Sequence, residues 1–178
     1  YYTVKLTVAT INRCFDSAFK AITVHPIPAV TITSSTNVCK GDTATLKADG
    51  AASYIWSDQN NNILCSNCQV LKVQPGSSSQ YKVVGVSQYG CSEIQTTNLH
   101  LVQPLKMLAA KGDTICFGQS KQLFAAGANS YTWYPETALS NKNAATPVAS
   151  PDQTTTYHVI GKDQYGCFAD TAEVKMVV

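Results

Sequence analysis

The sequence is short of charge. Of its 178 residues only 13% are charged, and 13 Lys and Arg against 11 Asp and Glu give a formal net charge of +2. The basic residues are scattered singly, so they form no patch of the kind that neutralises nucleic-acid phosphates. We therefore expect no nucleic-acid partner.

Long apolar runs are also missing. No apolar stretch approaches the roughly 18 residues that a membrane-spanning helix needs, and we expect no direct insertion into a membrane. No secretory signal peptide is visible, and the first residue is Tyr1 rather than Met. We therefore expect the sequence to be a segment of a longer protein.

The patterns of hydrolytic and metal chemistry are absent as well. The sequence has no G-x-S-x-G, its three histidines fall in unrelated places, and its three glutamates form no pair that spacing reveals. The eight aspartates are dispersed, without a D-x-D-x-D cluster for calcium. We expect no enzyme activity, no cofactor and no metal.

What the sequence does contain is an internal repeat. The stretch around Cys39 reads VCKGDTATLKADGAASYIW, and the later stretch around Cys116 reads ICFGQSKQLFAAGANSYTW. Gln-Tyr-Gly-Cys ends at Cys91 and again at Cys167, and a weaker echo ends at Cys14, which precedes Cys91 by the same offset that separates Cys39 from Cys116. Self-similarity at a fixed period indicates an array of like modules. This period fits a small, self-contained β domain.

Short alternating runs indicate strands. In the run 43–48, Ala44, Leu46 and Ala48 share one face. Further strands are expected at 53–56, 81–86, 94–102, 120–126, 130–133, 157–160 and 172–178. Strands at intervals of roughly 8–12 residues with turn residues between them are typical of an antiparallel sandwich. The predicted fold class is all-β, with tandem antiparallel β-sandwich domains arranged end to end.

Prolines mark the expected domain boundaries. Pro26 and Pro28 close the first segment, and Pro104 closes the second. Proline fixes its own φ and restricts the preceding residue, so we expect short, semi-rigid joints. We predict that residues 1–28 are the C-terminal part of a preceding domain and that 29–104 and 105–178 are complete domains.

Several short motifs together resemble a known family of repeats. They are C-x-G-x(4)-L at 39–46 and 116–123, S-Y-x-W at 53–56 and 130–133, Y-x-V at 81–83 and 157–159, and the closing Y-G-C. The combination is similar to the immunoglobulin-like and PKD-like repeats of large cell-surface or secreted proteins of gliding bacteria that use type IX secretion. The resemblance implies Ig-like and PKD-like sandwiches, with 1–28 the end of a PKD-like domain, and an extracellular or cell-surface location. It implies no ligand.

Seven cysteines are candidates for stapling these small domains. The last repeat contains only Cys116 and Cys167, so a bond inside it must join those two, and by the repeat we predict that Cys39 pairs with Cys91. A bridge closing about 50 residues would contribute roughly 3–4 kcal/mol through the unfolded state. Cys14 matches Cys91 and Cys167 in the repeat, and we expect it to be unpaired in this segment.

The remaining two cysteines, Cys65 and Cys68, form a C-x-x-C in an Asn-rich stretch that we expect to be a loop. A redox-active C-x-x-C normally begins a helix, and a zinc site needs two further ligands. The matching positions of the other repeat are Asn141 and Ala144, so both cysteines are absent together. We predict a small structural disulfide, with a redox pair and half a zinc site as the alternatives.

The aromatic residues have structural and functional interpretations. Trp56 and Trp133 are either sugar-stacking platforms or core residues of the third strand, and we favour the core. Tyr81 and Tyr157 resemble the corner tyrosines that tie a loop to the backbone. Tyr134 is replaced by serine in the other repeat. A position that differs between repeats is typically exposed, which makes Tyr134 the candidate ligand-binding aromatic.

A further pattern consists of Asp, a hydroxyl residue and then a small or branched apolar residue. It is similar to the acceptor motif for O-glycosylation in the same bacterial group. It occurs four times, which makes four hydroxyls candidate glycan attachment sites: Ser17, Thr43, Thr114 and Thr171. Thr-rich β proteins also produce such triplets by chance.

The expected function is a non-catalytic structural or adhesive repeat region of a large exported cell-surface protein, a stalk or filament that extends and displays. Its partners are expected to be neighbouring repeats, with surface polysaccharide or other copies of the chain as further candidates. Two alternatives stay open. One is a set of carbohydrate-binding or spacer modules of a secreted polysaccharide-degrading enzyme. The other is a self-associating subunit whose sheet edges pair with neighbouring copies.

Overall fold

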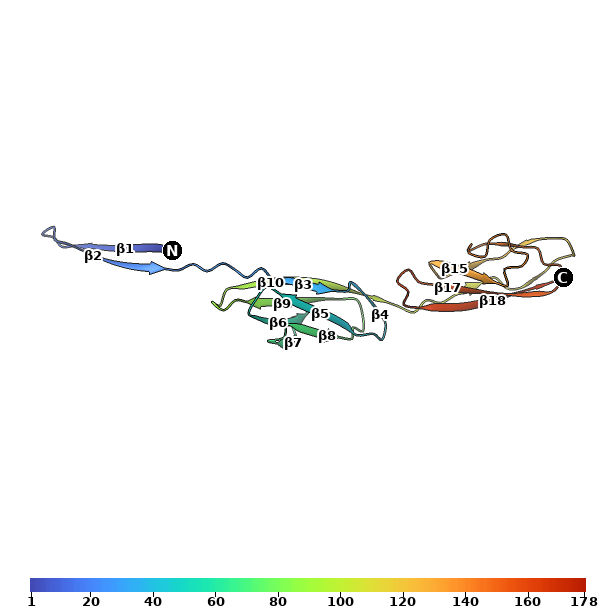
Figure 1. Ribbon diagram of the computed structural model, residues 1–178, viewed down its shortest axis with the longest axis horizontal. Coiled ribbons are helices and arrows are strands. Elements are labelled where there is room, and N and C mark those ends of the chain that lie inside the picture. The colour runs from blue at the N-terminus through green and yellow to red at the C-terminus, as the bar shows by residue number, and fades with distance from the viewer. The chain divides into compact units, whose positions relative to one another are not determined.

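The computed structural model describes residues 1–178 in full and consists of strands and turns (Figure 1). It contains no helix that could span a membrane. The chain divides into two compact units. The first comprises Tyr1–Ser34, Thr45–Lys72 and Gln80–Thr97, and the second comprises Ser35–Ala44, Val73–Ser79 and Asn98–Val178. The predicted all-β class is confirmed, whereas the predicted division at residues 28 and 104 stays a prediction.

The first two strands form a hairpin. β1 (Tyr2–Ala9) pairs antiparallel with β2 (Phe15–Ile22) along its full length, and the two form a sheet of their own. Every residue of both strands is exposed, including Phe15 and Phe19. A two-stranded hairpin with nothing packed on it is marginally stable in water.

Eight strands follow in two sheets. One sheet has the order β3 (Thr31–Ser34), β5 (Ala44–Asp49) and β8 (Val70–Val73). The other has the order β4 (Asn37–Cys39), β10 (Ser92–Val102), β9 (Ser79–Val86), β6 (Ser53–Asp58) and β7 (Ile63–Ser66). Strands β3, β5 and β8 correspond to A, B and E of an immunoglobulin sandwich, and β6, β9 and β10 to C, F and G. The edge strand β4 differs from the rest because it runs parallel to β10.

Alternation along these strands defines which face is buried. Ala44, Leu46 and Ala48 of β5 are buried while the residues between them are exposed, as predicted. On β6, Tyr54 and Trp56 point to the buried side. Successive side chains of a strand lie on opposite faces, so a period of two separates core from surface.

The second full repeat has the same plan with shorter strands. Its largest sheet has the order β12 (Asp113–Thr114), β18 (Ala169–Val177), β17 (Thr155–Lys162) and β15 (Ser130–Tyr134). Two small sheets pair β11 (Leu108–Ala109) with β14 (Ala125–Ala126), and β13 (Lys121–Gln122) with β16 (Val148–Ala149). The edge strand β12 again runs parallel to the last strand.

The strand predicted at 120–126 is wrong as a single element. It is divided into β13 and β14, which pair with different partners. Between the two, the backbone N–H of Leu123 donates to the Pro147 carbonyl at 2.8 Å. The chain therefore changes partner around Leu123, which the alternating pattern does not reveal.

The core of this repeat is built around large buried side chains. Trp133, Tyr157, Val159, Val174 and Met176 belong to one hydrophobic cluster contributed by β15, β17 and β18. Both Trp133 and its counterpart Trp56 are almost fully buried, so the prediction of core tryptophans is confirmed. The Tyr157 hydroxyl donates to a backbone carbonyl twenty residues upstream at 3.2 Å, which is the anchoring role predicted for it.

The buried tryptophan of each repeat forms the same hydrogen bond. The indole Nε1 of Trp56 donates to the Cys68 carbonyl at 2.8 Å, and that of Trp133 donates to the Ala144 carbonyl at 2.9 Å. A buried indole N–H that lacked an acceptor would cost a large desolvation penalty. The shared acceptor position therefore shows that the sequence repeat is also a structural repeat.

A tyrosine in the same strand repeats in the same way. The Tyr54 hydroxyl accepts the backbone N–H of Ala51 at 2.9 Å and donates to the carbonyl of the same residue at 3.0 Å. Tyr131 does the same with Ala128, at 3.2 and 2.9 Å. In each repeat one hydroxyl thus holds the turn that precedes the third strand.

Candidate functional site

The cysteine pairing departs from the prediction. Cys39 is bonded to Cys167, with an S–S distance of 1.97 Å and a Cα–Cα distance of 5.4 Å. Cys91 and Cys116 are free. The predicted pairs Cys39–Cys91 and Cys116–Cys167 are therefore wrong.

The strand geometry explains this correction. Cys39 lies beside Val102, at the far end of β10, because β4 pairs with β10 in parallel. Cys91 precedes the near end of the same strand, whose 11 residues span about 35 Å. Cysteine Cα atoms more than about 7 Å apart cannot be bridged. Cys116 and Cys167 are separated in the same way by the length of β18.

The other cysteine predictions agree with the structure. Cys65 and Cys68 are bonded to each other, and Cys14 is free and exposed. One detail is a correction, because Cys65 lies in β7 opposite Trp56 rather than in a loop. Asn67, between the two cysteines, has a φ of 61°. This left-handed residue turns the chain so that Cys68 can present its carbonyl to the Trp56 indole.

A recurring turn carries the cysteine that precedes each last strand. The N–H of the first turn residue donates to a carbonyl across the turn in all three copies: Thr10 to Cys14 at 2.9 Å, Ser87 to Cys91 at 2.8 Å, and Asp163 to Phe168 at 3.2 Å. A left-handed residue stands directly before each cysteine: Arg13 with φ 62°, Gly90 with φ 83° and Gly166 with φ 74°. The exposed hairpin β1–β2 therefore has a closing turn of the same kind as the two complete repeats, although in the last copy the acceptor is the residue after the cysteine.

Polar side chains fix this turn. In the last copy the Asp163 carboxylate accepts the backbone N–H of Tyr165 at 2.6 Å and that of Phe168. Partial burial would raise the pKa of Asp163, but hydrogen bonds from four backbone N–H groups outweigh it and lower that pKa. In the other repeat Ser87 Oγ accepts the N–H of Tyr89 at 3.3 Å and that of Cys91 at 3.2 Å.

A histidine lies against the tyrosine of the turn in each complete repeat. The rings of His25 and Tyr89 are stacked, with centroids 3.5 Å apart and an interplanar angle of 8°. The rings of His100 and Tyr165 are 6.1 Å apart and tilted by 55°. Cys91 Sγ lies 3.8 Å from the His25 carbonyl oxygen. The turn and its cysteine thus contact the chain that enters from the preceding segment.

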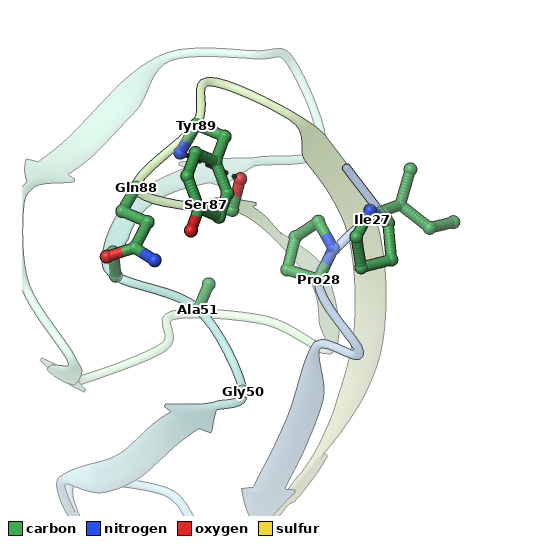
Figure 2. Close-up of a pocket in the computed structure, with 9 residues that line it drawn as sticks. Ile27, Pro28, Gly50, Ala51, Ser87, Gln88 and Tyr89 are labelled. Carbon is green, nitrogen blue, oxygen red and sulfur yellow. Dashed lines mark hydrogen bonds between the residues drawn. The ribbon is translucent and has the colours of Figure 1, made fainter. Parts of the chain in front are cut away.

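A pocket of about 420 Å³ lies beside the turn of the first complete repeat. Figure 2 shows Pro28 facing Tyr89 and Ser87 across the pocket, with Ala51 below them. The lining is mainly apolar and carries no charged side chain. Ser87 Oγ is already hydrogen-bonded within the turn. The pocket thus offers mainly apolar packing surface beside the turn.

Tyr134 is 44% exposed and lies on the edge strand β15. Its ring stacks on His158, with centroids 5.1 Å apart, and His158 Nδ1 is 3.8 Å from a Glu173 carboxylate oxygen. One face of the tyrosine ring is therefore occupied by a neighbour. Its role as a ligand-binding aromatic stays a prediction.

The four candidate glycan acceptors are all exposed: Ser17, Thr43, Thr114 and Thr171. In three of the four motifs the aspartate accepts the backbone N–H of the hydroxyl residue at 2.8 Å: Asp16–Ser17, Asp113–Thr114 and Asp170–Thr171. Their glycosylation stays a prediction. No group of three or more His, Cys, Asp or Glu side chains is placed to hold a metal ion.

No family model and no curated protein matches the chain. The chain is similar in structure to the fibronectin(III)-like modules of CbhA from Clostridium thermocellum, with 12% identity, a TM-score of 0.47, and 84% of this chain and 93% of that chain covered. It is also similar to murine CEACAM1b, with 11% identity, a TM-score of 0.48, and 84% and 100% covered. For the insect immune protein hemolin the identity is 11%, the TM-score 0.46, and the coverage 99% and 56%. The fold assignment itself rests on the strand order described above.

Proposed function

We propose that the chain is a non-catalytic stretch of tandem immunoglobulin-like domains in a large exported protein, where it extends and displays other parts of that protein at the cell surface. The observation that carries the proposal is that the residues shared by the two repeats form structural hydrogen bonds. The tryptophans, the strand tyrosines and the capped turn all serve folding in both copies. What is duplicated is a scaffold.

The disulfide bonds favour the proposal that the chain functions in an oxidising compartment. Two disulfides are present, one of them spanning 128 residues. Structural disulfides persist in secreted and cell-surface proteins and are rare where thiols are kept reduced. Export to the cell surface, by type IX secretion or another route, is part of the proposal.

Surface labelling of intact cells of the native host tests this function. An antibody raised against the chain should label cells without permeabilisation, and added protease should remove the label. A cytosolic protein of the same cells, probed in parallel, should stay unlabelled and uncut. Labelling that needs permeabilisation would exclude a surface role.

Carbohydrate binding is a second candidate, favoured by the exposed ring of Tyr134. A glycan array should then show binding that Tyr134→Ala abolishes and that Tyr2→Ala, at another exposed tyrosine, leaves intact. Equal binding by both variants, or no binding by the parent chain, excludes this candidate function.

The four candidate glycan sites need a separate test. The intact mass of the chain purified from its native host should exceed the sequence mass if glycans are attached.

Self-association is a third candidate, favoured by the hairpin β1–β2, which has no further hydrogen-bonded strand. Exposed strand edges offer unpaired backbone groups to a neighbouring chain. Sedimentation velocity in reducing buffer should then show a mass that rises with concentration. A constant monomer mass would exclude this mode of assembly.

A further inference from the structure

The Cys39–Cys167 bond joins two kinds of position that both recur. Cys39 is the last residue of the parallel edge strand, directly before a loop, and its counterpart in the following repeat is Cys116. We call a cysteine at this position a loop cysteine. Cys167 is a hairpin cysteine, which precedes the last strand, and its counterparts are Cys91 and Cys14. The bond therefore joins the loop cysteine of one repeat to the hairpin cysteine of the next.

The two loop cysteines are held alike. The N–H of Asp42 donates to the Cys39 carbonyl at 2.9 Å, and the N–H of Gln119 donates to the Cys116 carbonyl at 3.0 Å. Cys39 ends β4 and Cys116 closely follows β12, and each of these edge strands runs parallel to the last strand of its own repeat. Cys116 is free and exposed in this conformation. It thus has the backbone setting in which Cys39 forms its bond.

The surroundings of the free hairpin cysteine Cys91 indicate where a loop cysteine would lie to form a disulfide with it. Its Sγ, that of Cys91, lies 3.8 Å from the His25 carbonyl. His25 precedes Val102 by the same offset that separates Cys39 from Cys116, so the two are equivalent positions. In the bonded case Val102 pairs with Cys39, and its carbonyl accepts the N–H of Lys40 at 3.0 Å. Cys91 therefore faces the chain position beside which a loop cysteine lies in the bonded case.

The chain holds unmatched cysteines of both kinds. Cys116 is a loop cysteine without a following hairpin cysteine, whereas Cys14 and Cys91 are hairpin cysteines without a preceding loop cysteine. We propose that the loop-to-hairpin disulfide is the covalent link between successive repeats, and that Cys116 forms it with the hairpin cysteine of a further repeat of this kind. In a solution of the purified chain a second copy supplies that repeat, through Cys14 or Cys91.

The chemistry is thiol–disulfide exchange with a small-molecule disulfide as oxidant. The Cys116 thiolate attacks oxidised glutathione, which forms a mixed disulfide and releases one glutathione thiolate. The hairpin thiolate of the other copy then attacks the Cys116 sulfur and releases the second glutathione thiolate. Two protein thiols are oxidised, one glutathione disulfide is reduced to two thiols, and the two protons leave with them. Exposure of Cys116 and Cys14 gives both steps access.

Such a link is heterologous, because it joins unlike positions of the two copies. A heterologous contact that does not close into a ring leaves Cys116 of one terminal copy and free hairpin cysteines on the others, so it continues to add copies. We therefore expect a ladder of covalent oligomers rather than a single dimer. The link needs only the repeat and the observed bond, so its test and the surface-labelling test fail independently.

The experiment incubates the purified full chain in a buffer of reduced and oxidised glutathione and analyses it by non-reducing electrophoresis and peptide mass spectrometry. The expected result is a ladder whose cross-linked peptides join Cys116 to Cys14 or Cys91, with Cys39–Cys167 intact. Symmetric Cys116–Cys116 pairs as the main product, or a chain that stays monomeric, would overturn the proposal. So would a peptide map that joins Cys39 to Cys91.

Variants separate this link from random oxidation. Cys116→Ser should abolish the ladder, and the double change of Cys14 and Cys91 to serine should abolish it as well. Replacing Cys65 and Cys68 together should leave the ladder intact, because these two cysteines are bonded to each other. A ladder that survives Cys116→Ser would overturn the proposal, and circular dichroism of each variant shows whether the fold is retained.

Discussion

The carboxylate of Asp170 accepts the backbone N–H of Met107 at 2.9 Å. This contact ties the last strand of the repeat to the segment before its first strand. In the other repeat Glu93 accepts the N–H of Val30 at 3.1 Å, so the same kind of contact joins the last strand to the segment before the first strand. In each domain an acidic side chain of the last strand therefore accepts a backbone N–H from the segment before the first strand. Aspartate does this in one repeat and the longer glutamate in the other.

Asp170 should make the stability of the chain depend on pH in the acid range. Hydrogen bonds from the N–H groups of Met107 and Thr171 lower its pKa from an ordinary value of 3.8. A lowered folded-state pKa contributes stability above the unfolded-state pKa, and this is lost as pH falls through the folded value. Asp170→Asn should therefore melt lower at neutral pH and show a flatter decline between about pH 5 and pH 2.

Thermal unfolding followed by circular dichroism across this pH range measures the effect. Asp152→Asn is the matched control, because Asp152 is exposed. It should keep the parental slope. Equal acid slopes for Asp170→Asn and the parent would show that the charge of Asp170 is not involved.

Trp133 should be among the most costly positions to truncate. It is 1% exposed, and its indole N–H donates to the Ala144 carbonyl at 2.9 Å. Trp133→Phe leaves a cavity and an unpaired carbonyl, so we expect a loss of about 2–4 kcal/mol of unfolding free energy. Tyr134→Phe, at the exposed neighbouring residue, should change it by less than about 0.5 kcal/mol. Urea unfolding of both variants makes the comparison, and similar midpoints would contradict the core assignment.

Gly127 is required by both its conformation and its surroundings. Its φ is +98°, and a Cβ there would lie 2.2 Å from the Lys106 carbonyl oxygen. Gly127→Ala should therefore cost at least about 2 kcal/mol. Gly76→Ala, where a Cβ meets nothing within 4 Å, is the matched control and should be nearly neutral. The unfolding midpoint in urea distinguishes the two, and a neutral Gly127→Ala would show that the turn relaxes.

The sequence was sufficient where a local pattern decides the structure. The alternation of Ala44, Leu46 and Ala48 identified a half-buried strand, because a period of two sorts side chains between faces. The repeat predicted that Trp56 and Trp133 occupy the same core position, and their matching indole hydrogen bonds agree.

The cysteine pairing could not be predicted from the same information. The repeat correctly placed Cys39 with Cys116, and Cys91 with Cys167, as equivalent positions. Which of them meet depends on the parallel pairing of β4 with the far end of β10, a contact between segments about 60 residues apart in the sequence. No local propensity encodes that register. Once that register is known, the length of the last strand shows that its two ends are too far apart for one bond.

Mechanical unfolding should report the pairing directly. When the chain is pulled by its termini, an intact Cys39–Cys167 bond shields the 128 residues it spans from the force. Reduction should therefore add roughly 460 Å of contour length, at about 3.6 Å per residue. Two bonds within the repeats would instead release two separate segments of about 50 residues each, with a total gain of about 370 Å. Cys39→Ser should give the full extension without reductant. If reduction does not change the contour length of the parent chain, the Cys39–Cys167 bond does not form. That result would also contradict the proposed covalent link between successive repeats.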